Sequence, residues 1–351
     1  MRGTRMRKLL SAVLMAVMAL MISTVEAASM KEIDIRDIDG VFVGNAQDDQ
    51  AKTGVTVMIF PKGVPVGVDI SGGGPASRET PVISPTTNPT PVNAIVLAGG
   101  SAYGLAASDG VMQWLEEHGI GYDTKVSLVP IVVQSDIFDL GYGSTRRPDA
   151  GMGRAACEAA MRREKIKSGS YGAGTGATVG KLHGMVRSMK SGLGVYAVQI
   201  GELKVAAIVS VNALGDIYDH RDGKKIAGLL TADRKHFSDS RAELYGLDVK
   251  AMDRTNTTIG AIITNGRFDK TQLTKISSMA NAAYARCIAP VGTLADGDTI
   301  YSASVGSVEA DVNVAGTLAA DVMSEAIRRA IEASTMDDAE YLANCWAPKN
   351  H

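Results

Sequence analysis

The amino-acid sequence predicts one α/β domain, and three observations lead to this prediction. Short β-branched segments typical of strands alternate with segments whose apolar residues recur at helical spacing. The 351 residues are 45% hydrophobic and 21% charged, which is enough apolar content for a packed core and excludes a disordered chain. The length allows one large or two ordinary domains, but no internal repeat or low-complexity linker divides the chain. We therefore expect a single domain.

The predicted strands of the first hundred residues are short and bounded by Gly or Pro. Residues 55–60 and 64–70 are β-branched, and residues 94–98 form an apolar strand that ends at a Gly-Gly pair. Residues 72–91 are dense in Gly, Pro, Ser and Thr. This composition predicts a long loop, and a long loop in a compact domain often carries function.

The predicted helices and the remaining strands follow in alternation. Ser101 is placed to cap a helix that ends near residues 118–119. Residues 203–211 and 257–264 are further buried strands. Two later segments repeat apolar residues at helical spacing, one at Leu273, Ile276, Ala280, Ala283 and Cys287 and the other at Leu318, Val322, Ala326 and Ile327.

The first 27 residues have the three parts of a secretory signal peptide. Basic residues precede an apolar run over residues 9–22, and small residues at 25 and 27 follow it. The alternative is a membrane anchor, but the run has 14 residues and a spanning helix needs ~20. We expect cleavage after residue 27, a periplasmic or secreted mature protein, and no membrane association after signal removal.

Composition and motif spacing exclude several classes of function. Lys+Arg is 36 against 38 Asp+Glu, so the chain lacks the positive charge that nucleic-acid binding needs. Three cysteines, Cys157, Cys287 and Cys345, are too few for a disulfide framework or a zinc site, and whether any disulfide forms is open. The five histidines lack metal-ligand spacing. We expect no metal and no nucleic-acid partner.

The glycine-rich segment 172–181 is similar to a phosphate-binding loop but fails its pattern. The Walker spacing requires Gly where Thr175 stands, and Ser or Thr where Leu182 stands. The dinucleotide fingerprint is present only as a variant with Ala177, without a clear strand before it. A Gly-x-Ser-x-Gly elbow is also missing. We expect no cofactor.

One further stretch, Asp253 to Thr264, places a hydroxyl residue after Asn256 at the start of an apolar strand. If the Asn256–Thr257 peptide bond were cut, Thr257 would carry both a hydroxyl and a free α-amine. An α-amine has a pKa near ~7.7–8.0 and can act as the base for its own hydroxyl. From spacing alone an Asn-Thr pair is more often a turn, so both interpretations stay open at this point.

The sequence resembles the DmpA-type L-aminopeptidase/D-esterases, β-aminopeptidases and nylon-oligomer hydrolases, which are autoproteolytic N-terminal-nucleophile amidohydrolases. The resemblance extends from about residue 41 to residue 330 and is nearest to the nylon-oligomer branch, because the nucleophile is Thr rather than Ser. Six blocks in the family's order carry it: residues 72–80, 94–105, 172–181, 211–216, 256–260 and 296–298.

The resemblance implies roles for individual residues. Thr257 would be the nucleophile, released by self-cleavage of the Asn256–Thr257 bond. Lys181 matches the family's lysine near the nucleophile and would control the charge state of the hydroxyl and α-amine. Asn212 matches the asparagine whose side-chain N–H donates to the oxyanion. Considered without the family, Lys181 would be a solvated lysine on a turn and Asn212 a strand-end residue.

Two acidic residues and one substitution complete the comparison with the family. Asp296 and Asp298 match an acidic pair of the nylon-oligomer branch and could orient the α-amine or meet a substrate ammonium, although Ala-Asp-Gly-Asp-Thr also suits a surface turn. Phe138 stands where relatives carry a tyrosine near the active site. Whether Tyr142 replaces that tyrosine is open.

The function implied by the resemblance is hydrolysis of amide bonds in small peptides or amino-acid amides. The implied fold is a four-layer αββα sandwich of the DmpA/ornithine acetyltransferase type. Residues 28–256 would form a large subunit and residues 257–351 a small one, both in one domain, and the cleaved heterodimers would assemble into a homo-oligomer. The alternatives are an autoproteolytic N-acyltransferase like ornithine acetyltransferase and a non-catalytic exported binding protein. Substrate identity and oligomer size stay open.

Overall fold

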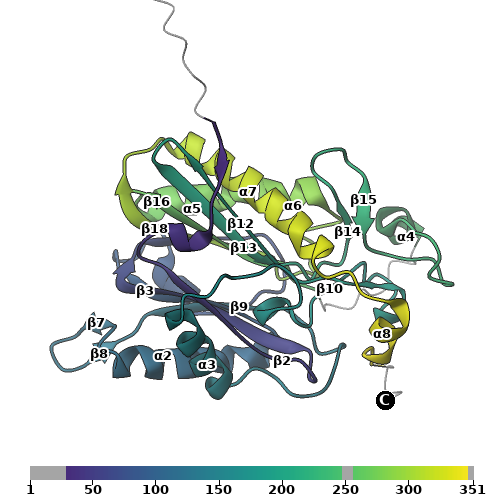
Figure 1. The fold of residues 1–351 in the computed structure, drawn as a ribbon, viewed down its shortest axis with the longest axis horizontal. Helices are drawn as coiled ribbons and strands as arrows, with labels where there is room; N and C mark the ends of the chain where they lie inside the picture. The colour runs from purple at the N-terminus through teal and green to yellow at the C-terminus, as the bar shows by residue number, and fades with distance from the viewer. Residues whose placement is uncertain (1–28, 247–255, 347–351) are drawn as a thin grey trace, which may run out of the picture.

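The computed structural model describes residues 29–246 and 256–346, and it has four layers. Two β-sheets lie face to face, with one group of helices on the outer face of each sheet (Figure 1). The four-layer αββα arrangement predicted above is therefore confirmed. The predicted signal peptide, residues 1–27, lies outside the described residues.

The first sheet has six strands and contains the segment that follows the predicted cleavage point. Its strand order is β1 (Lys31–Glu32), β12 (Leu193–Ile200), β13 (Leu203–Ser210), β16 (Ile259–Gly266), β18 (Thr299–Val308) and β4 (Val66–Ile70). All neighbouring pairs are antiparallel except β16 and β18, which run parallel. Residues from both sides of the Asn256–Thr257 bond thus share one sheet.

The second sheet has five strands. Its order is β2 (Phe42–Asp48), β3 (Thr53–Val64), β6 (Val92–Ala98), β9 (Val132–Asp136) and β5 (Ala76–Arg78). Smaller ladders join β7 (Tyr122–Asp123) to β8 (Leu128–Val129), β10 (Thr178–Val179) to β11 (Met189–Lys190), and β14 (Asp216–Tyr218) to both β15 (Lys225–Ala227) and β17 (Ile288–Ala289).

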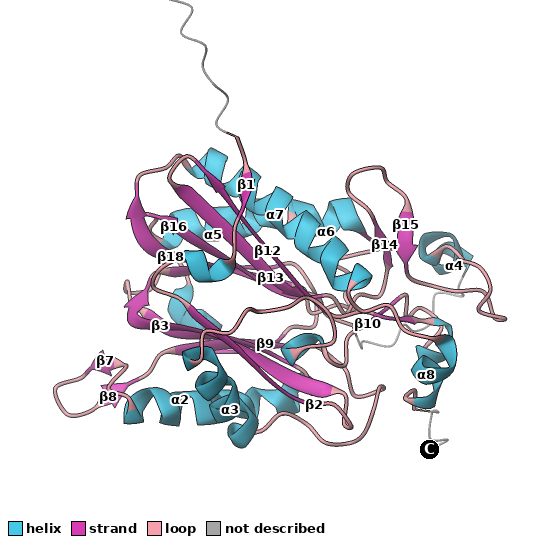
Figure 2. Cartoon of the chain, in the orientation of Figure 1, coloured by secondary structure: helices cyan, strands magenta, loops and turns pink. Residues whose placement is uncertain are grey.

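The helices divide between the two outer faces, as the cyan ribbons of Figure 2 show. The first sheet is covered by α5 (Lys270–Ala280), α6 (Ala282–Cys287) and α7 (Val312–Glu332), and the second by α2 (Ala107–Glu117) and α3 (Ala150–Met161). Two short helices, α4 (Ser240–Gly246) and α8 (Asp338–Ala343), lie beside the sandwich. Five 3₁₀ turns are η1 (Ile35–Asp37), η2 (Thr80–Ile83), η3 (Ser101–Ala106), η4 (Gly172–Gly174) and η5 (Met185–Arg187).

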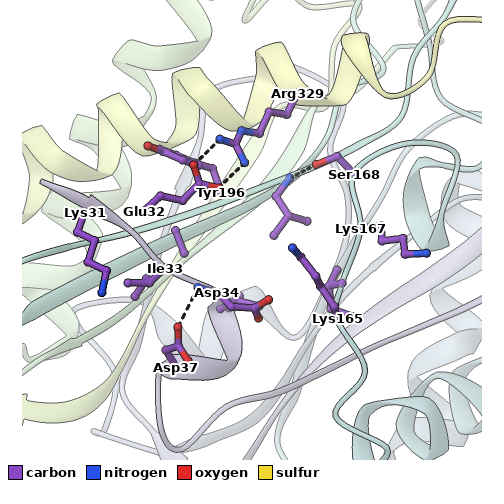
Figure 3. Close-up of a pocket in the computed structure, with 14 residues that line it drawn as sticks. Lys31, Glu32, Ile33, Asp34, Asp37, Lys165, Lys167, Ser168, Tyr196 and Arg329 are labelled. Carbon is purple, nitrogen blue, oxygen red and sulfur yellow. Dashed lines mark hydrogen bonds and ion pairs between the residues drawn. The ribbon is translucent and has the colours of Figure 1, made fainter.

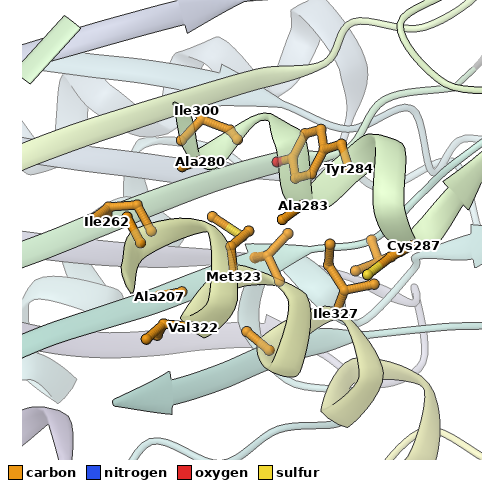
Figure 4. Close-up of a cluster of buried hydrophobic side chains, with 14 of the residues drawn as sticks. Ala207, Ile262, Ala280, Ala283, Tyr284, Cys287, Ile300, Val322, Met323 and Ile327 are labelled. Carbon is orange, nitrogen blue, oxygen red and sulfur yellow. The ribbon is translucent and has the colours of Figure 1, made fainter. Parts of the chain in front are cut away.

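Three separate hydrophobic cores fill the three spaces between the layers. Along β16, Ile259, Ala261 and Ile263 face the core between the sheets, while Ile262 faces the core beneath the helices. This alternation follows from the two-residue period of a strand. Figure 4 shows the helix-side core, in which Tyr284, Met323 and Ile327 pack over the sheet. Residues of odd number on β16 therefore point between the sheets.

The predicted strands before residue 100 are confirmed, but the structure places them in different sheets. The strand predicted at 55–60 extends from Thr53 to Val64 as β3, and the chain passes at Pro65 into β4 of the other sheet. Proline lacks the N–H that a continuous ladder would need, so it suits this crossing. The local sequence pattern predicted both strands, but which sheet each strand joins depends on the distant strands with which it pairs.

The prediction of one long loop over residues 72–91 is wrong in part. It contains the edge strand β5, which pairs with β9, and the turn η2. The structure of β5 depends on hydrogen bonds to β9, and the amino-acid composition of a segment cannot predict hydrogen bonds to a distant strand. Polar side chains in β5 suit its position at a sheet edge.

The prediction that Ser101 caps a helix is also wrong. The segment begins as η3, its N-cap is Gly100, and no side chain caps it. Gly100 has φ +86°, a left-handed value that glycine adopts without strain, and its N–H donates to Asp139 Oδ1 at 2.7 Å. The buried Asp139 carboxylate thus holds the backbone just before this turn, and no side chain caps the turn itself.

Within residues 29–246 and 256–346, no helix is long and apolar enough to cross a membrane. The same described residues hold no group of three or more His, Cys, Asp or Glu side chains arranged for a metal ion. All three cysteines are free thiols, and Cys157 and Cys287 are buried.

Candidate active site

The predicted nucleophile lies at one end of the sandwich, between the two sheets. Thr257 stands two residues before β16, which begins at Ile259 rather than at residue 257 as predicted. Side chains alternate between the two faces of a strand, so Thr257 is on the same side as Ile259 and Ala261, which face the core between the sheets. Its exposed fraction is 4% and that of Asn256 is 3%, so the bond between them is buried.

The backbone on both sides of the Asn256–Thr257 bond extends the parallel ladder between β16 and β18. The Asn256 N–H donates to Ala295 O at 3.2 Å, and the Gly297 N–H donates to Asn256 O at 3.0 Å. The Thr257 hydroxyl also donates to this Asn256 carbonyl oxygen. The hydroxyl is therefore in contact with the carbonyl group that it would attack during self-cleavage.

Lys181 and Asn212 meet Thr257 at a single oxygen atom. The main-chain carbonyl of Asn212, just beyond β13, accepts the Thr257 N–H at 3.0 Å and the Lys181 ammonium at 2.9 Å. Lys181 lies two residues after β10, which pairs with β11. The Lys181 N–H donates to Leu214 O, which ties the glycine-rich segment to the loop after Asn212. Lys181 and Thr257, which are far apart in the sequence, therefore both contact the same oxygen of Asn212.

The side chain of Asn212 does not contact Thr257. Its Nδ2 donates to Phe138 O at 3.0 Å, and its Oδ1 accepts the Thr178 N–H at 3.1 Å. A primary amide has two N–H donors, so one remains for a substrate oxygen. The contact of Asn212 with Thr257 is made by its main-chain carbonyl oxygen.

Asp298 holds the backbone beside Thr257. Its Oδ1 accepts the Thr258 N–H at 2.6 Å and its Oδ2 accepts the Gly292 N–H at 3.0 Å. Hydrogen bonds from N–H groups to a carboxylate are charge-assisted and stronger than neutral ones. Asp298 thus fixes the start of β16, one residue after Thr257.

Asp296 is held from two sides. Its Oδ2 accepts the Thr293 hydroxyl at 2.6 Å and the Thr293 N–H at 3.2 Å, and its Oδ1 accepts the Leu214 N–H at 3.4 Å. Asp296 is 1% exposed and Asp298 is fully buried, so the acidic pair does not form the exposed turn considered above.

Burial gives these groups unusual pKa values. Burial lowers the pKa of Lys181 to about 7, against the opposing charges of Asp296, Asp139 and Asp298. Burial, and then the charge of Asp296, raises the pKa of Asp298 to about 7. Burial likewise raises the pKa of Asp296. Lys181 and Asp298, whose pKa values lie near neutrality, can exchange protons at physiological pH, as acid–base chemistry requires.

Sequence reasoning missed Asp139. Burial raises the pKa of this carboxyl to about 6, and its charge in turn raises the pKa of Lys181. Its oxygens accept the Thr53 hydroxyl and the Gly100 N–H, both at 2.7 Å. The available signal was an acidic residue three positions after a buried strand, which is weak evidence in a single sequence.

Tyr142 lies outside this cluster of contacts. It is buried, its ring stacks on Tyr341 with centroids 5.4 Å apart, and its hydroxyl donates to the Met336 sulfur at 3.2 Å. Phe138 reaches the site through its main-chain oxygen, which accepts from Asn212. The hydroxyl of Tyr142 is therefore engaged away from Thr257.

A separate cleft of about 490 Å³ lies between β1, residues 165–168 and the end of α7. Figure 3 shows Lys31, Lys165 and Lys167 around it, with the ion pair between Glu32 and Arg329 at 2.8 Å on one wall. None of the described residues that line this cleft is a predicted site residue. It belongs to a different part of the fold from Thr257.

Comparison with known proteins assigns the family. The model of peptidase family S58 matches residues 34–341. An uncharacterized aminopeptidase of Mycobacterium leprae is 36% identical over 294 residues, covering 79% of each chain. A 6-aminohexanoate-oligomer endohydrolase of Kocuria sp. is 31% identical over 312 residues, covering 84% of each chain.

A solved structure supports the same fold at lower identity. The L-aminopeptidase D-Ala-esterase/amidase of Ochrobactrum anthropi, described as a variant of the Ntn-hydrolase fold, superposes with a TM-score of 0.62. It is 18% identical and covers 86% of each chain. The family match does not favour the acyltransferase or the non-catalytic alternative. The chain belongs to peptidase family S58, and it is a peptidase/amidohydrolase with an Ntn-hydrolase fold.

Proposed function

We propose that the protein matures by cutting its own Asn256–Thr257 bond and then hydrolyses amides with Thr257 as an N-terminal nucleophile. The observation that carries the proposal is the contact of the Thr257 hydroxyl with the Asn256 carbonyl oxygen, beside the buried Lys181 ammonium. Nucleophile, carbonyl group and titratable group are in place before any substrate binds.

In the maturation step, Thr257 Oγ1 attacks the carbonyl carbon of Asn256. The hydroxyl proton ends on the Thr257 nitrogen, the C–N bond breaks, and an ester joins Asn256 to Thr257 Oγ1. Water then hydrolyses the ester, which leaves a carboxylate on Asn256 and a free α-amine on Thr257. Fragments 28–256 and 257–351 result.

In turnover, the same hydroxyl attacks an amide, with the Thr257 α-amine as its base. The free N–H of the Asn212 side chain donates to the oxyanion, and water releases the acyl group. Since Thr257 is buried in the uncut chain, Asn256 must withdraw after cleavage before a substrate can reach the hydroxyl.

The proposed substrates are amide bonds of small peptides, amino-acid amides or amide oligomers. The names of the relatives support this class, since one is an aminopeptidase and another acts on 6-aminohexanoate oligomers. The buried acids Asp296 and Asp298 suit a substrate that carries an ammonium group. A screen of aminoacyl amides and amide oligomers against purified protein identifies the preferred member.

Intact-mass analysis of the purified protein tests maturation. We expect two fragments, the smaller beginning Thr-Thr-Ile-Gly, and both should be absent from Thr257→Ala. Thr257→Ser keeps a hydroxyl and serves as the matched control, which should still cleave. An uncut wild-type chain with full amidase activity would overturn the proposal.

Export and assembly form the remaining part of the proposal. The charged, apolar and small-residue sequence at the N-terminus supports removal of residues 1–27 and a periplasmic or secreted location. We also propose that cleaved heterodimers assemble into a homo-oligomer. Light scattering of the purified protein measures the mass, and a single heterodimer at working concentration would contradict this assembly.

A further inference from the structure

The ladder between β16 and β18 continues past the ends of both strands to the bond that is to be cut. Thr299 N donates to Thr258 O at 3.1 Å, and the next donor along the ladder, Gly297 N, reaches Asn256 O at 3.0 Å. A backbone N–H is thus aimed at the one carbonyl oxygen that would become negative during self-cleavage. Its position is fixed by the pairing of the sheet, so it needs no rearrangement.

Position 297 admits this approach because it is glycine. A Cβ built there would lie 2.7 Å from Thr257 Oγ1 and 2.8 Å from Gly74 O. Both distances are below van der Waals contact, so any side chain would displace the hydroxyl or the backbone of residue 74. Glycine lets the donor and the nucleophile approach the same carbonyl group.

The other amide in the site does not serve this oxygen. The Asn212 Nδ2 donates to Phe138 O at 3.0 Å, and the contact of Asn212 with Thr257 is through its main-chain carbonyl. The Thr257 hydroxyl, which also touches the Asn256 oxygen, gives up its proton as it attacks. Among the described residues with a hydrogen bond to the Asn256 oxygen, Gly297 alone offers a donor that persists through the reaction.

We propose that the Gly297 N–H is the oxyanion donor of self-cleavage. As Thr257 Oγ1 forms its bond to the Asn256 carbon, the electron pair of the carbonyl moves onto the oxygen that Gly297 holds. The proton goes from the hydroxyl to the Thr257 nitrogen, and the C–N bond then breaks to leave the ester. The inference rests on the proposed maturation at Asn256–Thr257.

The test replaces the Gly297 backbone N–H, and with it the hydrogen-bond donor, by an ester oxygen. Translation of the full chain with glycolic acid in place of Gly297 exchanges the N–H for an ester oxygen and adds no side chain. The matched control carries the α-hydroxy analogue of threonine at position 299, which removes the neighbouring ladder bond to Thr258 O. Both chains are also made on the Thr257→Ala background, where the thermal unfolding transition shows that they fold.

The rate of precursor disappearance on a denaturing gel gives the outcome. Loss of one oxyanion donor costs ~100- to 1,000-fold in other hydrolases, and we expect a loss of that size for the ester at 297. The ester at 299 should cleave at nearly the rate of the unmodified chain. Equal rates for the two esters would overturn the inference, as would loss of the unfolding transition in the 297 chain alone, which would make the bond a folding contact.

These outcomes separate the inference from the proposal on which it rests. If the unmodified chain fails to cleave at Asn256–Thr257, the proposed maturation is wrong. If the unmodified chain cleaves and both esters cleave equally fast, maturation stands and only the role of Gly297 is lost.

Discussion

The Lys181 ammonium and the Thr257 backbone N–H donate to the same atom, the main-chain carbonyl oxygen of Asn212, at 2.9 and 3.0 Å. The Thr257 nitrogen is the atom that must gain a proton when the Asn256–Thr257 bond breaks. Since burial lowers the pKa of Lys181 to about 7, this amine can give or take a proton near neutral pH. The Asn212 carbonyl therefore holds the Thr257 nitrogen and the Lys181 amine, which can carry a proton, at the same atom.

Lys181→Met should slow maturation and abolish amide hydrolysis, because it keeps the apolar stem and removes the amine. Lys181→Ala should behave in the same way. Lys275→Met, on the exposed side of α5, is the matched control and should mature and turn over normally. The measurements are the remaining precursor on a gel and kcat per cleaved chain. A normal kcat for Lys181→Met in the cleaved fraction would place the active site elsewhere.

Asn212→Ala should lower kcat by ~100- to 1,000-fold in the cleaved fraction while KM changes little. The reason is that an oxyanion contact is made mainly in the transition state. The thermal midpoint must be measured alongside, because the side chain also binds the Phe138 oxygen and the Thr178 N–H. A lower midpoint with normal kcat would assign Asn212 to structure alone.

Thr293→Val should move the acidic limb of the pH–rate profile to higher pH. The Thr293 hydroxyl and N–H both lower the pKa of Asp296, against burial, which raises it. Loss of the hydroxyl raises this pKa further, so a higher pH is needed to ionise the carboxyl. Thr293→Ser keeps the 2.6 Å hydrogen bond in kind and should keep the profile. An unmoved limb in Thr293→Val would mean that ionised Asp296 is not required.

Lys190 predicts a pH dependence of stability. Burial lowers the pKa of Lys190 to about 7, whereas an unfolded lysine titrates near ~10.4. Between these values the unfolded chain binds more protons than the folded chain, so stability rises with pH, by up to ~1.4 kcal/mol per pH unit for one such group. Below pH ~7 the cost of burying the charge is fully present.

Denaturant unfolding of the Thr257→Ala chain at several pH values between 7 and 10 measures this slope. Lys190→Met on the same background removes the titrating amine and should flatten the slope. Its overall stability in this pH range should also fall, because the Lys190 Nζ donates to Gly174 O and Ala177 O, both at 3.2 Å. Lys275→Met is the control, and a slope unchanged in Lys190→Met would contradict the predicted titration.

Export is tested by fractionation and N-terminal sequencing. The basic start and short apolar run predict that the mature chain begins at Ala28 or a near neighbour, in the periplasm or medium. Replacing Leu14 and Val17 with arginine breaks the apolar run and should keep the precursor in the cytoplasm. Met1 retained on a cytoplasmic wild-type protein would refute export.

The sequence by itself determined the local elements and the family, and it predicted Thr257 as the nucleophile. Continuous apolar runs predicted the buried strands β6 and β13, and the 3.6-residue period predicted α5 and α7, because these patterns report which faces of an element are buried. The ordered blocks around Asn256, Lys181, Asn212 and the Asp296–Asp298 pair identified the family, because the residue types and their order can be read from the sequence without the structure.

Only the tertiary structure decided which atoms of those residues meet. Sequence reasoning predicted a role for the Asn212 side chain at the oxyanion, and only the fold shows that the Asn212 main-chain carbonyl accepts the Thr257 N–H. It missed Asp139 and the N–H of Gly297, because a backbone donor has no sequence signature and a buried charge acquires its pKa from distant segments. Strand pairing and burial are properties of chain segments brought together across the fold, and no local pattern encodes them.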